Sequence, residues 1–399
     1  MWEKTIPIDQ VREIRCKTTA YLGVGAMEKM FDIAKELKKM GVTKIIAVTG
    51  KAAYKTTGAW DYVEKACAEN GIRWTLYNKI SPNPSSIDVD EATEMARSFG
   101  AEAVIGIGGG SPIDAAKSVA IMVNYPQHTT ADLYEYKFTP EKALPLIAIN
   151  TTHGTGTEVD RFAVVSILEK EYKPAIAYDI SYPLYAIDDP KLMTGLPANQ
   201  TTYTTVDAIN HIVEACTTVV ASPYTIMLAK ETVRLIERYL PKALENGEDL
   251  EARYYLLYAS LIAGICFDNG MLHLTHALEH PLSAVKPDLA HGLGLAVLLP
   301  SIVRNIYPAC GAVLSDVLAP LVPGLTGDAS EAEKAAAGVK KWLSSVGIKD
   351  TLSTLGYTQA DVAKLTKLAF TTPSLDLLLG MSPVKATEEL VSRIYSESL

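Results

Sequence analysis

The sequence lacks the features that mark secreted, membrane-spanning and nucleic-acid-binding proteins. Its five cysteines are odd in number and widely scattered, which argues against a disulfide framework. No apolar run reaches the roughly 20 residues that span a bilayer, and no charged-then-apolar leader opens the sequence. The 37 basic residues are outnumbered by 46 acidic ones, and the resulting net charge of −9 does not favour nucleic acid. We therefore expect a cytoplasmic protein that binds neither a membrane nor nucleic acid.

Histidine is also scarce, with seven in the chain, but most of it is concentrated in one region. Asp207 and His211 are four residues apart in a helical pattern, as are His276 and His280, and His291 follows a proline-containing loop. Residues i and i+4 lie on one face of a helix, so each pair can point into one cavity. Imidazoles with one carboxylate suit Fe²⁺ or Zn²⁺. A lone histidine is more often a packed core or surface residue, but burying this many without partners would be costly.

A glycine-rich turn predicts a nucleotide site. The apolar strand pattern Ala103–Ile107 is followed by Gly108–Gly110 and then by a helical pattern, with Ser111 expected as the N-cap, Pro112 at the first helical position and Asp114 three residues after the cap. Glycines let the backbone approach a ligand, and the free N–H groups of a helix N-terminus favour an anion such as a pyrophosphate. The segment only approximates GxGxxG, and an ordinary strand-to-helix turn is the alternative.

Other segments of the N-terminal half support the nucleotide interpretation. A buried strand pattern at Lys44–Thr49 ends at Gly50, and another strand pattern runs into the Thr/Gly segment Thr151–Thr157. Strands that alternate with helices predict a doubly wound parallel sheet of the Rossmann-like type. Ligands bind such sheets at the carboxyl ends of the strands, where all three loops would lie.

The C-terminal half of the sequence has a different secondary-structure pattern from the N-terminal half. From about Gly195 strand patterns give way to helical ones, and Tyr254–Phe267 is apolar on nearly every face, as expected of a central core helix. A chain of 399 residues is long for one domain. We expect a nucleotide-binding α/β domain over residues 1–194 and an all-helical metal-binding domain over residues 195–399.

Several motifs together resemble the iron-containing (group III) alcohol dehydrogenases. They are YLGVGA (21–26), SPNPS (81–85), GGGSPIDAAK (108–117), TTHGTGTEV (151–159), DAINH (207–211), HALEHPLSA (276–284) and AHG (290–292). The resemblance implies that metal and cofactor lie in a cleft between the two domains. It assigns the metal ligands to Asp207, His211, His276 and His291, and places His280 near the metal as a catalytic residue that assists proton transfer.

The resemblance also implies the reaction. Hydride would pass between C4 of a nicotinamide and a small primary alcohol or aldehyde whose oxygen lies on the metal, which acts as a Lewis acid. The metal expected from the family is Fe²⁺, although three imidazoles and a carboxylate would bind Zn²⁺ more tightly. Apolar surroundings favour short aliphatic alcohols, from methanol to butanol, or a short diol. The family forms dimers and larger rings, so we expect a homo-oligomer.

The cofactor is expected to be NADP(H) rather than NAD(H). Family members that prefer NAD tend to carry an acidic residue just after the first long strand, where this sequence has Gly50 followed by Lys51. Glycine leaves room for a 2′-phosphate and lysine offers charge; the alternative is that Lys51 and Lys55 are ordinary solvated lysines. Further contacts carried over from the family are the cofactor residues Asn83, Gly109, Gly110, Ser111, Thr151, Thr152, Thr155 and Lys173, and the substrate-pocket residue Phe267.

The sequence leaves the roles of two histidines undecided, and it leaves two alternative classes of function, another enzyme of the related fold or a sensing protein. His153 stands where the family usually has a small residue, and it either faces the nicotinamide or points away. His273 precedes His276 by three residues and could orient a ligand by hydrogen bonds. The related fold also serves dehydroquinate synthase, a lyase, and glycerol dehydrogenase. A metal- or nucleotide-sensing protein is the non-enzymatic alternative.

Overall fold

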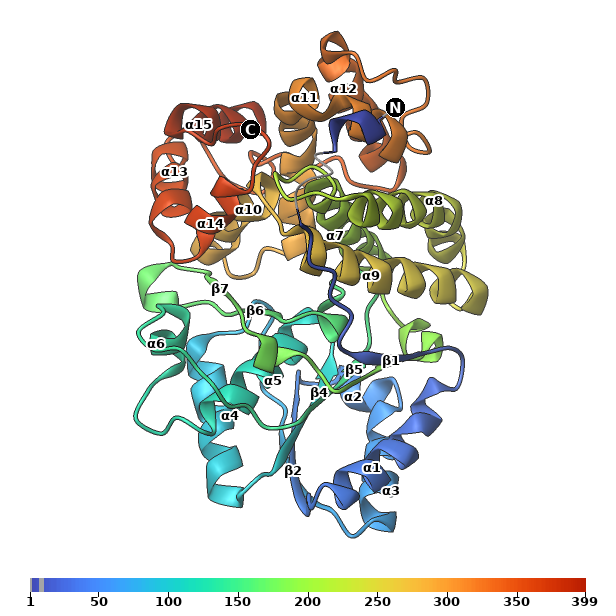
Figure 1. The fold of residues 1–399 in the computed structure, drawn as a ribbon, viewed down its shortest axis with the longest axis vertical. Helices are drawn as coiled ribbons and strands as arrows, with labels where there is room; N and C mark the ends of the chain where they lie inside the picture. The colour runs from blue at the N-terminus through green and yellow to red at the C-terminus, as the bar shows by residue number, and fades with distance from the viewer. Residues whose placement is uncertain (1, 7–10) are drawn as a thin grey trace.

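The N-terminal half is built on a six-stranded parallel sheet. The computed structural model describes residues 2–6 and 11–399. The strands lie in the order β1-β8-β5-β4-β2-β3, and every neighbouring pair is parallel. Their bounds are β1 Thr19–Leu22, β2 Lys44–Thr49, β3 Arg73–Tyr77, β4 Ala103–Gly108, β5 Leu146–Asn150 and β8 Tyr185–Asp188. The predicted doubly wound sheet is confirmed, as are the strand patterns at 44–49 and 103–107 (Figure 1).

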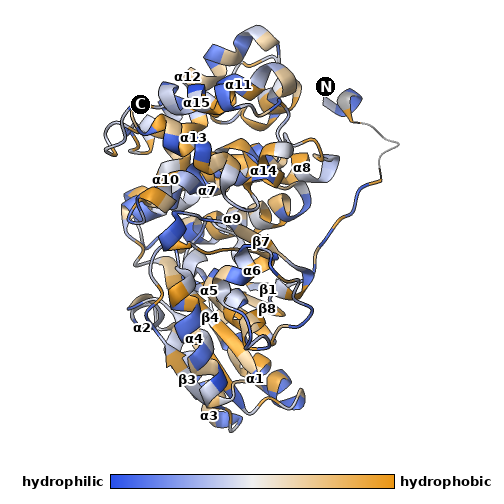
Figure 2. Ribbon diagram, turned by 90° about the vertical axis from the view of Figure 1, so that its left-hand side faces the viewer, coloured by the Kyte–Doolittle hydropathy of each residue, from blue (hydrophilic) through white to orange (hydrophobic). Residues whose placement is uncertain are grey.

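Helices cover both faces of this sheet because its strands are apolar on both sides. In β2, Ile45 packs with one set of helices, whereas Ile46 packs with the other, since successive side chains point to opposite faces. The first set contains α1 (Lys29–Lys39) and α3 (Ala59–Glu69), and the second contains α4 (Ser86–Phe99) and α5 (Gly110–Met122). The orange strands in Figure 2 show the same apolar centre. The loops at the carboxyl edge are thereby set on a sheet that is buried on both faces.

The C-terminal half is helical. After β8 the described chain contains no further strand, and α7 begins at Ala198. The helices are α7 Ala198–Ala215, α8 Pro223–Glu245, α9 Leu250–Gly270, α10 Leu274–Val285, α11 His291–Val317, α12 Ala332–Ser345, α13 Val362–Thr371, α14 Leu375–Gly380 and α15 Glu388–Glu397. They share one large apolar cluster. Figure 1 shows this half above the sheet, with both chain ends in it. The boundary between residues 194 and 195 stays a prediction.

Two of these helices are longer and more apolar than the sequence analysis expected. By length and composition alone, α9 and α11 could cross a membrane, contrary to the expectation that no apolar run is long enough. In each helix, however, 61% of the apolar window is buried inside the fold. Burial of this kind is typical of central core helices, as predicted for Tyr254–Phe267. All five cysteines are free, which confirms that no disulfide framework is present.

The start of α5 corrects one sequence prediction. Ser111 is not the N-cap: the helix begins at Gly110, Gly109 is the cap, and no side chain caps it. Ser111 lies inside the first turn, where its hydroxyl accepts a hydrogen bond from the backbone N–H of Asn83 at 3.2 Å. Asp114 instead bonds to Thr157 and to the backbone of Val164. The cap prediction was wrong because the side chains of Ser111 and Asp114 bond to residues distant in sequence. The first N–H groups of the helix therefore have no side-chain cap.

Candidate metal and cofactor site

A large cavity lies where the carboxyl edge of the sheet meets the helical half. Its volume is about 730 Å³, within the usual range for a ligand pocket. The two halves both line it: Gly109, Gly110 and Ser111 from the α/β half, and His276 and His291 from the helical half. Every predicted metal ligand and His280 line this cavity, as do all the predicted cofactor residues except Thr151, which is buried after β5.

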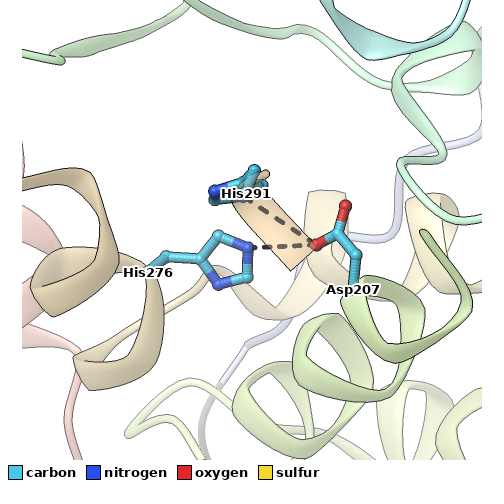
Figure 3. Close-up of side chains that lie close together, drawn as sticks. All are labelled: Asp207, His276 and His291. Atoms are coloured by element: carbon cyan, nitrogen blue, oxygen red, sulfur yellow. Dashed lines mark ion pairs between the residues drawn. The ribbon is translucent and has the colours of Figure 1, made fainter. Parts of the chain in front are cut away.

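Four predicted ligands converge in the cavity wall. From Asp207 Oδ1, the Nε2 atoms of His211, His276 and His291 lie at 3.3, 3.6 and 3.9 Å. Figure 3 shows His276 and His291 directed at this carboxylate. A tetrahedral ion with bonds of about 2.0–2.2 Å separates its donors by roughly 3.3–3.6 Å. The His211 and His276 spacings match this range, and the His291 spacing is slightly longer. The donor atoms of Asp207, His276 and His291 lie within 4.8 Å of one another, close enough to hold one small divalent ion, whereas His211 falls outside that group.

Unsatisfied polar atoms support the same conclusion. Asp207 Oδ1 and His276 Nε2 are buried and have no hydrogen-bond partner among the described residues. Buried polar atoms without partners are costly, so they indicate a group that would occupy the space between them. Burial alone would raise the pKa of Asp207, but the neighbouring imidazole of His211 helps to keep it below its usual value. Asp207 is thus a carboxylate that can bind a cation.

Glu214, which the sequence analysis missed, orients His276. Its carboxylate contacts His276 Nδ1 directly and also accepts hydrogen bonds from the backbone N–H groups of His273 at 2.9 Å and Thr275 at 2.8 Å. Burial raises the pKa of Glu214, but the imidazoles of His276 and His273 outweigh it and bring the pKa to about 2. A proton on Nδ1 is therefore fixed towards Glu214, which leaves Nε2 free to ligate.

Glu279, which the sequence analysis also did not identify, orients His291 as Glu214 orients His276. Its carboxylate contacts His291 Nδ1, and Lys173 Nζ lies 3.3 Å from the same carboxylate. Lys173 further donates to Asn83 Oδ1 at 2.9 Å and to Ser283 Oγ at 2.8 Å. The two predicted cofactor residues Lys173 and Asn83 are thereby placed beside the metal donors. The cofactor contact predicted for Lys173 stays a prediction, since four side chains, those of Asn83, Glu279, Ser283 and His291, already lie within hydrogen-bond distance of its ammonium group.

The cofactor side of the cavity is formed by loops that follow three strands. Gly50 and Lys51 follow β2, and the turn at Gly109 and Gly110 follows β4. Thr152 and Thr155, after β5, also line the cavity. A Cβ atom at Gly109 would lie 2.9 Å from the Thr152 side chain, and one at Gly110 would lie 2.9 Å from that of Thr155. These glycines are therefore needed so that the two loops can pack together.

Phe267 lines the cavity beside the candidate ligand His211. Its ring stacks on that of His211, with centroids 4.4 Å apart, and lies 5.5 Å from the ring of Phe162. All three residues line the cavity, as the predicted substrate-pocket role of Phe267 requires. Phe162, on the short strand β6 (Phe162–Val164), was not singled out from the sequence because its position depends on the hairpin that β6 forms with β7 (Ala175–Ala177).

The structure settles where the two unexplained histidines point. His153 faces away from the cavity: Thr205 Oγ1 lies 3.2 Å from its Nδ1, and an Arg253 nitrogen lies 2.8 Å from its Nε2. Burial and the Arg253 charge lower the pKa of His153 to about 3. His273 caps α10, with its Nδ1 accepting from the Leu274 N–H, and so helps to position His276 three residues later.

We predict that Glu214→Gln weakens metal binding. The amide cannot hold Nδ1 of His276 as the carboxylate does, and loss of such a partner costs about 10–100-fold in metal affinity. Competition with a chelator would measure this affinity. Glu237→Gln, at an exposed position on α8, is the matched control. Equal affinity in the Glu214 variant and the control would show that the carboxylate does not support a ligand.

Comparison with known proteins places these features in a family. The sequence profile of the iron-containing alcohol dehydrogenases matches residues 18–190, and the profile of the C-terminal part of the Fe-containing alcohol dehydrogenase family matches residues 201–399. The long-chain primary alcohol dehydrogenase AdhA of Thermoanaerobacter ethanolicus is 58% identical over 398 residues, covering 100% of both chains.

Solved structures agree with the sequence comparison. An archaeal halo-thermophilic alcohol dehydrogenase from a Red Sea brine pool superposes with a TM-score of 0.90 at 29% identity, covering 98% of this chain and 100% of that one. The NADH-dependent butanol dehydrogenase A of Thermotoga maritima gives a TM-score of 0.87 at 29% identity, covering 98% of each chain. With its parallel sheet, its helical second half and profile matches over both, the chain belongs to the iron-containing alcohol dehydrogenase family.

Proposed function

We propose that this protein is a metal-dependent, NADP(H)-preferring alcohol dehydrogenase and aldehyde reductase that transfers hydride between nicotinamide C4 and a primary alcohol or aldehyde. The observation that carries the proposal is the convergence of three imidazole Nε2 atoms and one carboxylate in the wall of a cavity that also contains the free N-terminus of α5. When bound, a divalent ion, Fe²⁺ or Zn²⁺, would supply Lewis acidity and a nicotinamide would supply the redox chemistry. Cytoplasmic location and homo-oligomeric assembly stay predictions.

Within this proposal, the residues of the chain have distinct tasks. Asp207, His211, His276 and His291 would hold the ion. The N–H groups at the start of α5 would face the cofactor phosphates, since no side chain caps them. Phe267 covers His211 and excludes water from one side of the donors. The protein thus contributes orientation and a largely apolar enclosure for hydride transfer.

The function is tested by metal-dependent turnover. The protein would be stripped of metal, loaded anaerobically with Fe²⁺ or Zn²⁺, and mixed with short aldehydes and NADPH or NADH while absorbance at 340 nm is followed. We expect NADPH oxidation that requires the metal. The absence of turnover with both nicotinamides and both metals would reject the proposal in favour of a lyase or a sensing protein of the same fold.

Gly50 is expected to allow the 2′-phosphate of NADP(H). A Cβ atom here would lie 3.5 Å from the Ile80 carbonyl oxygen, an ordinary contact, so the backbone at this position accommodates a Cβ atom. Gly50→Asp should lower the preference for NADPH over NADH, measured as the ratio of kcat/KM values, by about tenfold or more, because a carboxylate repels the phosphate. Gly50→Asn is the uncharged control of similar size. An unchanged ratio in Gly50→Asp would mean that another residue selects the cofactor.

His280 is our candidate for proton transfer. It lines the cavity, and its ring centroid lies 6.4 Å from that of His276 and 5.9 Å from that of His291. Burial and the nearby charge of Lys173 hold its pKa well below the usual value, so the imidazole is neutral at neutral pH. No hydrogen bond to the described residues engages its buried Nδ1, so the neutral ring is available as a proton acceptor.

We expect His280→Ala to lower kcat by about 10²–10⁴-fold, the usual contribution of a general acid or base, while the bound metal content is retained. Steady-state kinetics and elemental analysis of the same preparation would measure both quantities. Loss of metal in step with activity would instead identify His280 as a ligand.

A further inference from the structure

The loop that follows β5 has two sides that contact different parts of the molecule. We call residues 151–157 the threonine loop. Its Thr152 and Thr155 line the cavity next to the predicted cofactor turn. His153, which lies between them in sequence, is buried and points instead to the helical half. The threonine loop therefore joins the cofactor side of the cavity to the helices that carry the candidate metal ligands.

The backbone of the threonine loop is packed directly on two of these helices. A Cβ atom at Gly154 would lie 1.8 Å from the Thr204 carbonyl oxygen on α7, and one at Gly156 would lie 2.4 Å from the Cα atom of Gly264 on α9. The Gly154 N–H also donates to Ser260 Oγ on α9 at 2.6 Å. Close-packed interiors transmit displacement, so the threonine loop cannot shift without moving α7 or α9.

His153 attaches the threonine loop to α7 by two routes. Thr205 Oγ1 lies 3.2 Å from the ring Nδ1, and Arg253 Nη1 lies 2.8 Å from Nε2. The same Arg253 nitrogen donates to Thr201 Oγ1 at 2.8 Å. Because a guanidinium group can only donate, Nε2 is the acceptor and the proton of the neutral ring is on Nδ1, directed at Thr205. Thr201 and Thr205 lie on α7, and the candidate metal ligand Asp207 follows Thr205 by two residues.

Arg253 is a buried cation that needs His153 as an acceptor. Only 1% of its surface is exposed, and burial lowers its pKa. Among the described residues no carboxylate forms an ion pair with it. Its N–H groups bond instead to neutral acceptors, which are His153 Nε2, Thr201 Oγ1 and the carbonyl oxygens of Leu196 and Gly247. A buried charge is stable only when its hydrogen bonds are satisfied, so removal of the imidazole would displace Arg253 or the threonine loop.

We propose that His153 is a positioning residue that couples binding of the nicotinamide cofactor to binding of the metal ion, with Arg253 holding it against α7. The inference rests on the proposed function, from which it takes the two ligands. A cofactor that contacts Thr152 or Thr155 fixes the threonine loop, and through His153 the loop fixes the turn of α7 that precedes Asp207. Whichever ligand binds first therefore preorganises the site of the second, and the two strengthen each other by the same factor.

The coupling is measured by binding, without turnover. The dissociation constant of NADPH would be determined from its fluorescence with the metal-free protein and with the Zn²⁺-loaded protein. We expect the loaded wild type to bind NADPH about 5–150-fold more tightly, the usual range for coupled sites. His153→Ala should lower this ratio at least about fivefold, the lower end of that range. Direct attraction between the ion and the cofactor remains in the variant, so the difference between the two proteins measures the contribution of the threonine loop.

Three further variants make the test specific. His153→Gln keeps an acceptor for Arg253 and should retain most of the wild-type ratio. Thr205→Val removes the hydroxyl that meets Nδ1 with little change of shape, and should lower the ratio even if His153→Ala does not fold. His128→Ala is the matched control, because His128 stacks on Phe138 and does not line the cavity. Thermal unfolding of each protein would record stability separately from the ratio.

The outcomes separate this inference from the proposed function. A wild-type ratio of one, or variants that lose stability but keep the wild-type ratio, would overturn the coupling and leave the proposed function standing. A ratio that depends on His153, without turnover of any alcohol or aldehyde, would support the coupling and reject the proposed reaction. Failure of the wild type to bind either NADPH or NADH would reject both proposals.

Discussion

The buried carboxylate of Glu214 is the interaction on which the candidate metal site depends. It lies on α7, seven residues after Asp207, and accepts bonds from the N-terminal backbone of α10 as well as from the His276 imidazole. One side chain thereby joins the two helices that carry three of the four candidate ligands and sets the tautomer of one of them. A buried carboxylate is stable only with such partners, so the arrangement constrains both helices at once.

A second network extends this constraint to the α/β half. Lys173 contacts Glu279, which orients His291, and also bonds to Asn83. The Asn83 amide in turn donates to the carbonyl oxygens of Pro287 and Leu289, in the loop that leads into His291. The position of His291 therefore depends on residues from both halves of the chain. The cofactor side and the metal side of the cavity form one connected structure.

The sequence allowed the parts of the site that depend on local periodicity to be predicted. The pair Asp207 and His211 and the pair His276 and His280 lie on helices as expected, because a four-residue spacing is a property of the helix itself. Glu214 and Glu279 were missed because a glutamate on a helix has the same local pattern whether it is exposed or buried. The direction of His153 depends on Arg253, 100 residues away, and could not be predicted from spacing.

The glycines of the turn after β4 are required by packing as well as by the predicted ligand. Gly109 and Gly110 were interpreted as leaving room for a pyrophosphate, and the structure shows that they also leave room for Thr152 and Thr155. A side chain at either position would displace a threonine that lines the cavity, so the turn after β4 and the loop after β5 must change together. The requirement for glycine thus follows from packing alone, before any ligand binds. The free N–H groups of α5 can face a ligand only because the threonine loop already holds the turn in place.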